Sequence, residues 1–132
     1  MKILFLGDIV GPSGCMVVKK YLKKIVEENK INFVIANGEN AAHNGVGITK
    51  DVLDNLIKFG INVLTTGNHV WDHKETLKLV EDDNRLLRPF NLIGVSPGKG
   101  FEIYQTSKNL KIGVLNLMGN VCLLYTSDAA DE

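Results

Sequence analysis

Three apolar runs in this sequence each end in a short motif that sets glycine beside a side chain able to bind a metal ion or move a proton. These side chains are Asp8 after the first run, Glu39 and Asn40 after the second, and Asn68 and His69 after the third. Carboxylates and amide carbonyls are hard oxygen donors that suit Mg, Mn or Fe(II), and imidazole shifts the preference toward transition metals. A carboxylate shared by two ions about 3.5–4 Å apart is the usual arrangement for displacement at phosphorus. The set therefore predicts a site for two divalent ions, with Fe or Mn expected and Mg as the alternative.

Alternating strands and helices must position these motifs. The apolar runs predict strands near residues 2–6, 32–36 and 61–65. Between and after them, apolar residues at helical spacing predict helices near 15–29, from an N-cap at Thr49 to a stop at Gly60, and near 74–81. This alternation predicts an α/β fold with a parallel sheet and right-handed crossovers, in which ligands bind beyond the carboxyl ends of the strands. Because the loop of the middle strand lies between the other two, Glu39 is the acid better placed to bridge two ions.

The remaining segments are predicted from turn signals. Residues 7–14 read as a glycine-rich loop. Residues 101–105 alternate in polarity and residues 110–117 are apolar, which predicts two strands of a hairpin with its turn near 107–109.

Each motif also has a simpler structural interpretation. Asp8 is in a position typical of a loop cap, Asn37 and Asn40 are common turn residues, and Asn68-His69 could cap the next helix. The occurrence of such motifs at three successive strand ends favours a functional site over three separate structural roles.

Composition excludes several other classes of protein. Fifteen basic and fifteen acidic side chains give a net charge of zero, so there is no electrostatic signal for nucleic acid. No apolar run approaches the roughly 18 residues of a membrane span, and the N-terminus lacks the pattern of a signal peptide. Two cysteines do not make a disulfide framework, so we expect a cytoplasmic protein that is not bound to a membrane.

The three motifs resemble the first three metal motifs of the calcineurin-like metallophosphoesterases. They read Gly7-Asp8-Ile9-Val10-Gly11, Asn37-Gly38-Glu39-Asn40 and Gly67-Asn68-His69. The Glu-Asn pair is typical of the YmdB-like branch, whose members act as cyclic-nucleotide phosphodiesterases. The resemblance implies an α/β/β/α sandwich, here truncated to its first βαβαβ sheet and the strands that follow.

The resemblance also implies a role for each residue. Asp8 and Asn40 would serve one ion, Asn68 the other, and Glu39 both. His69 would donate a proton to the leaving oxygen, a role that suits a side chain whose pKa lies near neutrality. The implied activity is metal-dependent hydrolysis of a small phosphodiester, with a 2′,3′-cyclic nucleotide as the expected substrate.

The chain departs from the family pattern in two ways. The family adds a lone His and a later His-x-His, and the remaining histidines here, His43 and His73, do not occupy those motifs. Cys15 stands where the family more often has a basic residue. His43 could contact substrate or lie in a solvated loop, and His69 with His73 has the i, i+4 spacing of some zinc sites, but without the adjacent glutamate.

The end of the sequence resembles the translation of a sequencing adapter. We therefore expect residues 1–121 to be the N-terminal part of a metallophosphoesterase domain and residues 122–132 to be non-native. A chain cut at this point would lack ligands of the second ion, so we expect it to have little activity alone.

A non-catalytic nucleotide- or phosphate-binding α/β module is the competing hypothesis. It would use the loop at residues 7–14 at a helix N-terminus, although that loop lacks both common phosphate-binding patterns and contains an acid. The physiological substrate, the native metal and homo-oligomer formation are left open by the sequence.

Overall fold

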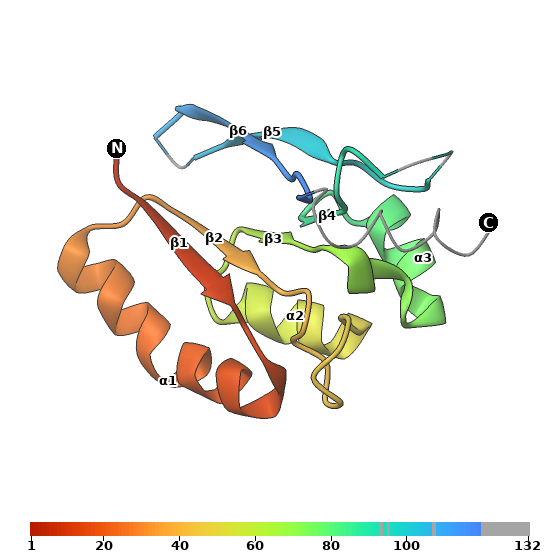
Figure 1. The fold of residues 1–132 in the computed structure, drawn as a ribbon. Coiled ribbons are helices and arrows are strands. Elements are labelled where there is room, and N and C mark those ends of the chain that lie inside the picture. Colours follow the sequence, from red (N-terminus) through yellow and green to blue (C-terminus); the bar gives the residue numbers. More distant parts are fainter. Residues whose placement is uncertain (93, 95, 107, 120–132) are drawn as a thin grey trace, which may run out of the picture.

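The computed structural model describes residues 1–92, 94, 96–106 and 108–119, so the predicted non-native tail lies outside the described residues. Figure 1 shows a parallel sheet with helices on one side and a two-stranded hairpin on the other. The elements in chain order are β1 (Ile3–Asp8), α1 (Gly11–Asn29), β2 (Phe33–Asn37), α2 (Lys50–Lys58), β3 (Val63–Thr65), the 3-10 helix η1 (Asn68–Trp71), α3 (Lys74–Asp82), β4 (Leu86–Leu87), β5 (Phe101–Gln105) and β6 (Lys111–Leu115).

The main sheet has the strand order β1-β2-β3-β4, and all its neighbouring pairs are parallel. The predicted α/β class and parallel sheet are therefore confirmed, and β2 lies between β1 and β3 as expected. The two-residue strand β4 was not predicted, because so short a segment shows no periodicity. Since the strands run in one direction, the motifs that follow β1, β2 and β3 share one edge.

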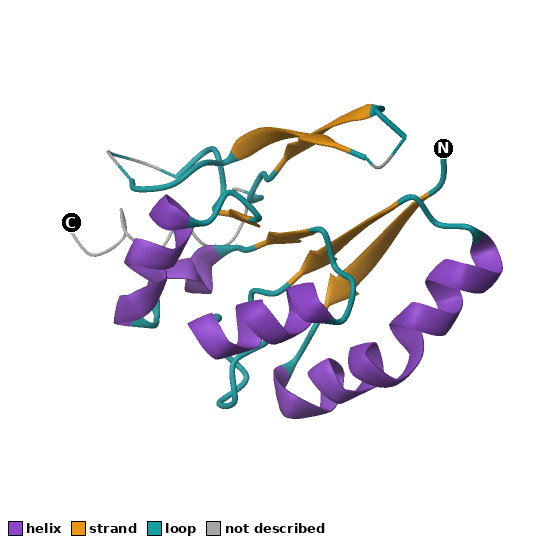
Figure 2. Cartoon of the chain, turned by 180° about the vertical axis from the view of Figure 1, so that it is seen from behind, coloured by secondary structure: helices purple, strands orange, loops and turns teal. Residues whose placement is uncertain are grey.

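Helices α1 and α2 cover one face of this sheet (Figure 2). Their apolar stripes meet the strands in a core that includes Leu22 of α1, Leu56 of α2 and Leu64 of β3. Burial of these side chains supplies most of the driving force for the layer, at about 25 cal/mol per Å² of apolar surface. Among the described residues, no helix combines the length and apolar character needed to cross a membrane.

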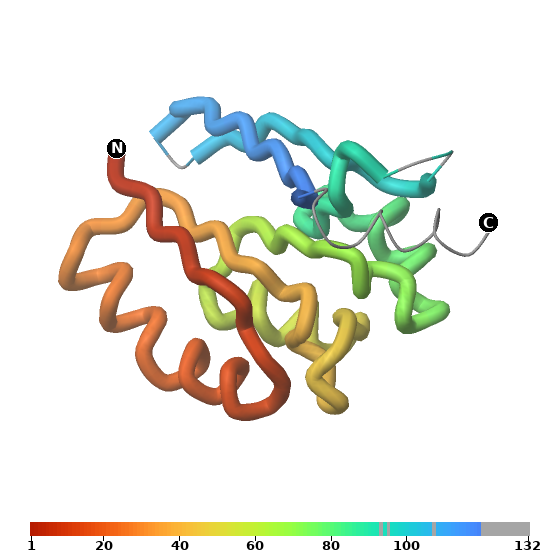
Figure 3. Tube along the Cα trace, viewed as in Figure 1, coloured from red at the N-terminus to blue at the C-terminus, as the bar shows by residue number. Residues whose placement is uncertain are grey.

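The predicted hairpin of β5 and β6 is confirmed and lies over the other face of the sheet (Figure 3). Ile112 and Val114 of β6 pack against a second apolar cluster formed by one residue each of β2, β3 and β4, namely Phe33, Val63 and Leu87. The hairpin does not cover β1, whose Ile3 and Phe5 are 45% and 60% exposed.

Asn116 joins the hairpin to the edge that carries the motifs. Its buried amide donates two hydrogen bonds of 2.9 Å, to the carbonyl oxygens of Thr66 and Leu87. Thr66 directly precedes Gly67, so the hairpin helps to fix the start of the third motif.

The prediction of a loop over residues 7–14 is wrong. Strand β1 continues through Asp8 and α1 already begins at Gly11. Pro12 is tolerated in the first helical turn, because the N–H that it lacks would have no partner within the helix. Gly11 has a φ of +56° and donates its N–H to Asn40 O at 2.8 Å, so a glycine ties the helix start to the second motif.

Both predicted ends of α2 are confirmed. Thr49 is its N-cap residue, although the Thr49 side chain makes no capping hydrogen bond. Gly60 follows the C-cap with a φ of +114°, a conformation that favours glycine.

Leu56→Ala tests the helix layer. Leu56 is fully buried, so the substitution should lower the free energy of unfolding by about 2–5 kcal/mol. Leu77→Ala on α3 is the matched control, because Leu77 is 46% exposed and its loss should change stability by less than about 0.5 kcal/mol. Urea unfolding followed by circular dichroism measures both variants, and equal effects would contradict this assignment of the core.

Candidate functional site

Asp8 and Asn40 are in contact at the carboxyl ends of β1 and β2. Asn40 Nδ2 donates a hydrogen bond of 2.9 Å to Asp8 Oδ2. The backbone supports this pair, since Ile9 N donates to Asn37 O at 3.0 Å. The side-chain bond uses one oxygen of Asp8 and the amide nitrogen of Asn40, so their other oxygens can face a further ligand.

A tight turn after β2 orients Glu39. Asn37 Oδ1 accepts a hydrogen bond of 3.1 Å from Glu39 N, so Asn37 has the turn role that was its simpler interpretation. Gly38 packs closely on Leu64, where an added Cβ would lie 2.9 Å from Leu64 Cδ2. The turn therefore rests on the apolar core and directs Glu39 toward β3.

The carboxylate of Glu39 lies directly against Gly67. A Cβ on Gly67 would come within 2.1 Å of Glu39 Oε2, so only glycine leaves space for the acid in this position. His69 N donates a hydrogen bond of 3.2 Å to Glu39 Oε1. The second and third motifs are thereby joined through Glu39.

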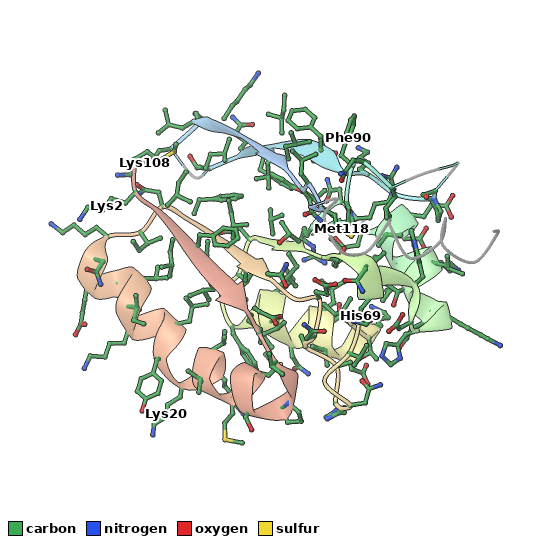
Figure 4. The ribbon with its side chains drawn as sticks, in the orientation of Figure 1. Lys2, Lys20, His69, Phe90, Lys108 and Met118 are labelled. Atoms are coloured by element: carbon green, nitrogen blue, oxygen red, sulfur yellow. The ribbon has the colours of Figure 1, made fainter. Side chains whose placement is uncertain are left out.

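Asn68 and His69 are the first two residues of η1, at the carboxyl end of β3. Figure 4 labels His69 on the segment between β3 and α3. Asn68 is exposed, and the half-buried His69 places Nδ1 2.7 Å from Asp72 Oδ2. Sequence reasoning missed Asp72, for which the signal is the three-residue spacing from His69 across one turn.

The structure thus brings all five predicted site residues to one edge of the sheet. The two contacts Asp8–Asn40 and Glu39–His69 link three strand ends. Their roles as metal ligands and proton donor stay predictions.

His73 points to the loop after β2 and has a structural role. Its Nε2 lies 2.8 Å from Val46 O, and a Cβ on Gly47 would meet the His73 ring at 2.7 Å. This contact directs the His73 ring nitrogen to the loop backbone, which argues against a zinc site made with His69.

Cys15 and His43 line a groove of about 290 Å³ between α1 and α2. Cys15 Sγ donates to Ala41 O at 3.6 Å, and burial raises the pKa of the Cys15 thiol. A raised pKa leaves less thiolate at neutral pH, so this environment does not activate the cysteine. His43 is exposed at the rim of the same groove.

The side chains at the edge are of the chemical types that hard divalent cations prefer. They comprise the carboxylates of Asp8 and Glu39 and the amides of Asn40 and Asn68, and the space at Gly67 admits the Glu39 carboxylate. Within the part of the chain that the structure describes, no three His, Cys, Asp or Glu side chains form a metal-binding group. The fit therefore depends on the two amides as well as the two acids.

Comparison with known proteins decides the family. A family model described as "YmdB-like protein" matches residues 4–130. The chain belongs to the YmdB-like family. The match includes most of residues 122–132, which we expected to be non-native; the origin of that segment stays a prediction.

Relatives of this YmdB-like chain include proteins with stated activities. The chain is 42% identical to a 2′,3′-cyclic-nucleotide 2′-phosphodiesterase of Bacillus subtilis (strain 168), over all of this chain and 50% of that protein. Two crystal structures align over the whole chain with TM-scores of 0.84. One is a hypothetical protein from Thermus thermophilus, at 31% identity and 54% coverage of that chain. The other is a phosphatase from Mycoplasma pneumoniae, at 30% identity and 52% coverage. The chain thus spans about half the length of these relatives.

Gly67→Ala tests the contact between Glu39 and the third motif. The added methyl group should displace the flexible Glu39 side chain and break its hydrogen bond with His69 N. The amide of His69 should then exchange with solvent about tenfold faster or more, because hydrogen bonds to charged groups contribute about 1.5–3 kcal/mol. Hydrogen exchange followed by NMR measures this rate.

Gly7→Ala is the control for Gly67→Ala, because a Cβ on Gly7 would meet no atom within 4 Å. It should leave exchange at His69 unchanged. Unchanged exchange in both variants would show that Glu39 does not bind this backbone.

Proposed function

We propose that this YmdB-like chain carries the N-terminal part of the catalytic site of a metal-dependent phosphodiesterase, and that the full-length protein hydrolyses 2′,3′-cyclic nucleotides. The observation that carries the proposal is the linkage made by consecutive residues of one turn. Asn40 binds Asp8 on one side, and Glu39 binds the backbone of His69 on the other. Glu39 is therefore the acid that can serve ions on both sides.

The charge of the two acids supports cation binding. In the described part of the chain, Asp8 accepts a hydrogen bond from an amide and Glu39 from a backbone N–H, and neither forms an ion pair. Neutral donors orient a carboxylate without cancelling its charge. Two such acids at one edge repel each other, and cations between them would relieve that repulsion.

The proposed roles are those that the resemblance to the metallophosphoesterases implies, and the placement of the five residues at one edge supports them. Asp8 and Asn40 would hold one ion, Asn68 the other, and Glu39 both. When bound, two divalent ions, Fe or Mn with Mg as the alternative, would supply Lewis-acid stabilisation of the phosphate. His69 would protonate the departing ribose oxygen, a step that typically contributes about 10²–10⁴-fold to the rate.

The name of the Bacillus subtilis relative supports a cyclic nucleotide as substrate, and both named relatives above support hydrolysis of a phosphoester. Because this chain spans about half of each, we propose that it has little turnover alone.

Asp8→Asn tests metal binding by the chain itself. The change removes one negative charge, so the affinity for Mn²⁺ should fall by at least about tenfold. Changes to residues around a metal site typically lower metal affinity by about 10–100-fold, and tenfold is the lower end of that range. Equilibrium dialysis measures the affinity. Asp54→Asn is the matched control, because Asp54 forms an exposed pair with Lys50 at 2.8 Å on α2. Anion binding that needs no metal and is insensitive to Asp8→Asn would favour the non-catalytic binding module instead.

Hydrolysis of a 2′,3′-cyclic nucleotide tests the activity. The full-length protein should show turnover that depends on added Mn²⁺ and is lost after chelation, and the Glu39→Gln variant should be inactive. The 132-residue chain should show little or none. Robust turnover by residues 1–121 would refute the expected incompleteness, and inactivity of the full-length protein with each of the three metals would refute the proposed function.

A further inference from the structure

We infer that Asp72 is a positioning residue for His69, which it holds with the proton on Nδ1 so that Nε2 is the nitrogen presented to the leaving oxygen. This inference rests on the proposed function, in which His69 is the proton donor. The observation behind it is the 2.7 Å separation of His69 Nδ1 and Asp72 Oδ2.

The 3-10 helix explains why these two side chains meet. Residues three apart are eclipsed in a 3-10 helix, so Asp72 lies directly over His69. Asp72 is the C-cap of η1, and its backbone N–H donates to His69 O at 3.2 Å. The backbone of Asp72 therefore contacts the backbone of His69, and the side chain of Asp72 contacts the His69 ring.

Glu39 makes a second contact with His69, at its backbone. Its carboxylate accepts the His69 backbone N–H at 3.2 Å. Glu39 thus contacts the backbone of His69 and Asp72 contacts its ring.

The chemistry of a carboxylate decides which nitrogen carries the proton. An ionised carboxylate only accepts hydrogen bonds, so His69 Nδ1 must be the donor. His73 has the opposite arrangement, since its Nε2 lies at Val46 O. Of these two histidines it is therefore His69 that presents Nε2 for proton transfer.

Hydrolysis adds water across one phosphorus–oxygen bond of the substrate. The water oxygen bonds to phosphorus, and the bond to the leaving ribose oxygen breaks with its electron pair moving to that oxygen. The leaving oxygen takes the proton of His69 Nε2, and the proton lost by the water later replaces it. Asp72 keeps the remaining proton on Nδ1 during and after the transfer, as in the acid–histidine pair of serine hydrolases.

The pair contributes little to folding. The two side chains are 38% and 41% exposed, and ion pairs of that exposure are screened by solvent. Removing Asp72 should therefore leave the stability of the protein unchanged, and any loss of rate would come from the site.

Asp72→Ala in the full-length protein tests the inference with two substrates. A 2′,3′-cyclic nucleotide has a poor leaving group that needs protonation, whereas bis(p-nitrophenyl) phosphate has a good one that does not. We expect kcat for the cyclic nucleotide to fall by roughly 10–100-fold, the range for residues that orient a site histidine, with KM unchanged. The rate with the activated diester should be unchanged.

Two further variants make the test specific. Asp54→Ala removes the matched exposed acid of α2 and should change neither rate. In a His69→Ala background, Asp72→Ala should cause no additional loss, because its effect acts through the ring.

The ring itself gives a readout that does not depend on activity. Long-range ¹H–¹⁵N NMR should show His69 Nδ1 protonated in the neutral ring of the wild type and the proton shifted toward Nε2 in Asp72→Ala. The same tautomer in both proteins, or equal losses on both substrates, would overturn the inference. If the wild type hydrolyses neither substrate, the proposed function fails, and the NMR result still decides whether Asp72 fixes the ring.

Discussion

The close contact between the Glu39 carboxylate and Gly67 is the constraint on which the candidate site depends. The contact exists because β2 and β3 are paired in parallel, with Asn37 opposite Thr65. The segments that follow these two strands therefore leave the sheet next to each other. Gly38 lets the turn after β2 rest on Leu64, and Gly67 leaves room for the acid that the turn delivers. A side chain larger than hydrogen at Gly67 would displace the Glu39 carboxylate from its contact with the third motif.

The apolar layers support this edge from both faces of the sheet. The helices pack on one face of the sheet and the hairpin on the other, so the strands that deliver the motifs are held from both sides. The loop after β2 is anchored to α3, where Thr76 Oγ1 donates to Ile48 O at 2.8 Å and His73 meets Val46. Polar groups at the edge are thus positioned before any ligand binds, which lowers the free-energy cost of ordering them on binding.

Asp83 differs from the two acids of the candidate site, Asp8 and Glu39, in the groups that surround it. Asp83 accepts a hydrogen bond from the Arg85 guanidinium, which lowers the pKa of the Asp83 carboxyl. The positive charge of Arg85 offsets the negative charge of the Asp83 carboxylate. Asp8 and Glu39 instead accept their hydrogen bonds from neutral N–H donors, the Asn40 amide and the His69 backbone. An aspartate therefore forms a structural ion pair at Asp83 and belongs to the candidate ion site at Asp8. The two differ in the group that donates a hydrogen bond to the carboxylate, a guanidinium at Asp83 and an amide at Asp8.

The sequence by itself determined the α/β class, the parallel sheet, the ends of α2, the hairpin and the five side chains at the sheet edge. It could do so because apolar periodicity sets the elements and parallel strands bring their carboxyl ends to one edge. Only the tertiary structure decided that α1 begins at Gly11, since Pro12 and Gly11 read equally well as a loop. It alone brought Asp72 to His69 and turned His73 away to Val46, because the direction of a side chain depends on the local helix type and on packing between distant segments.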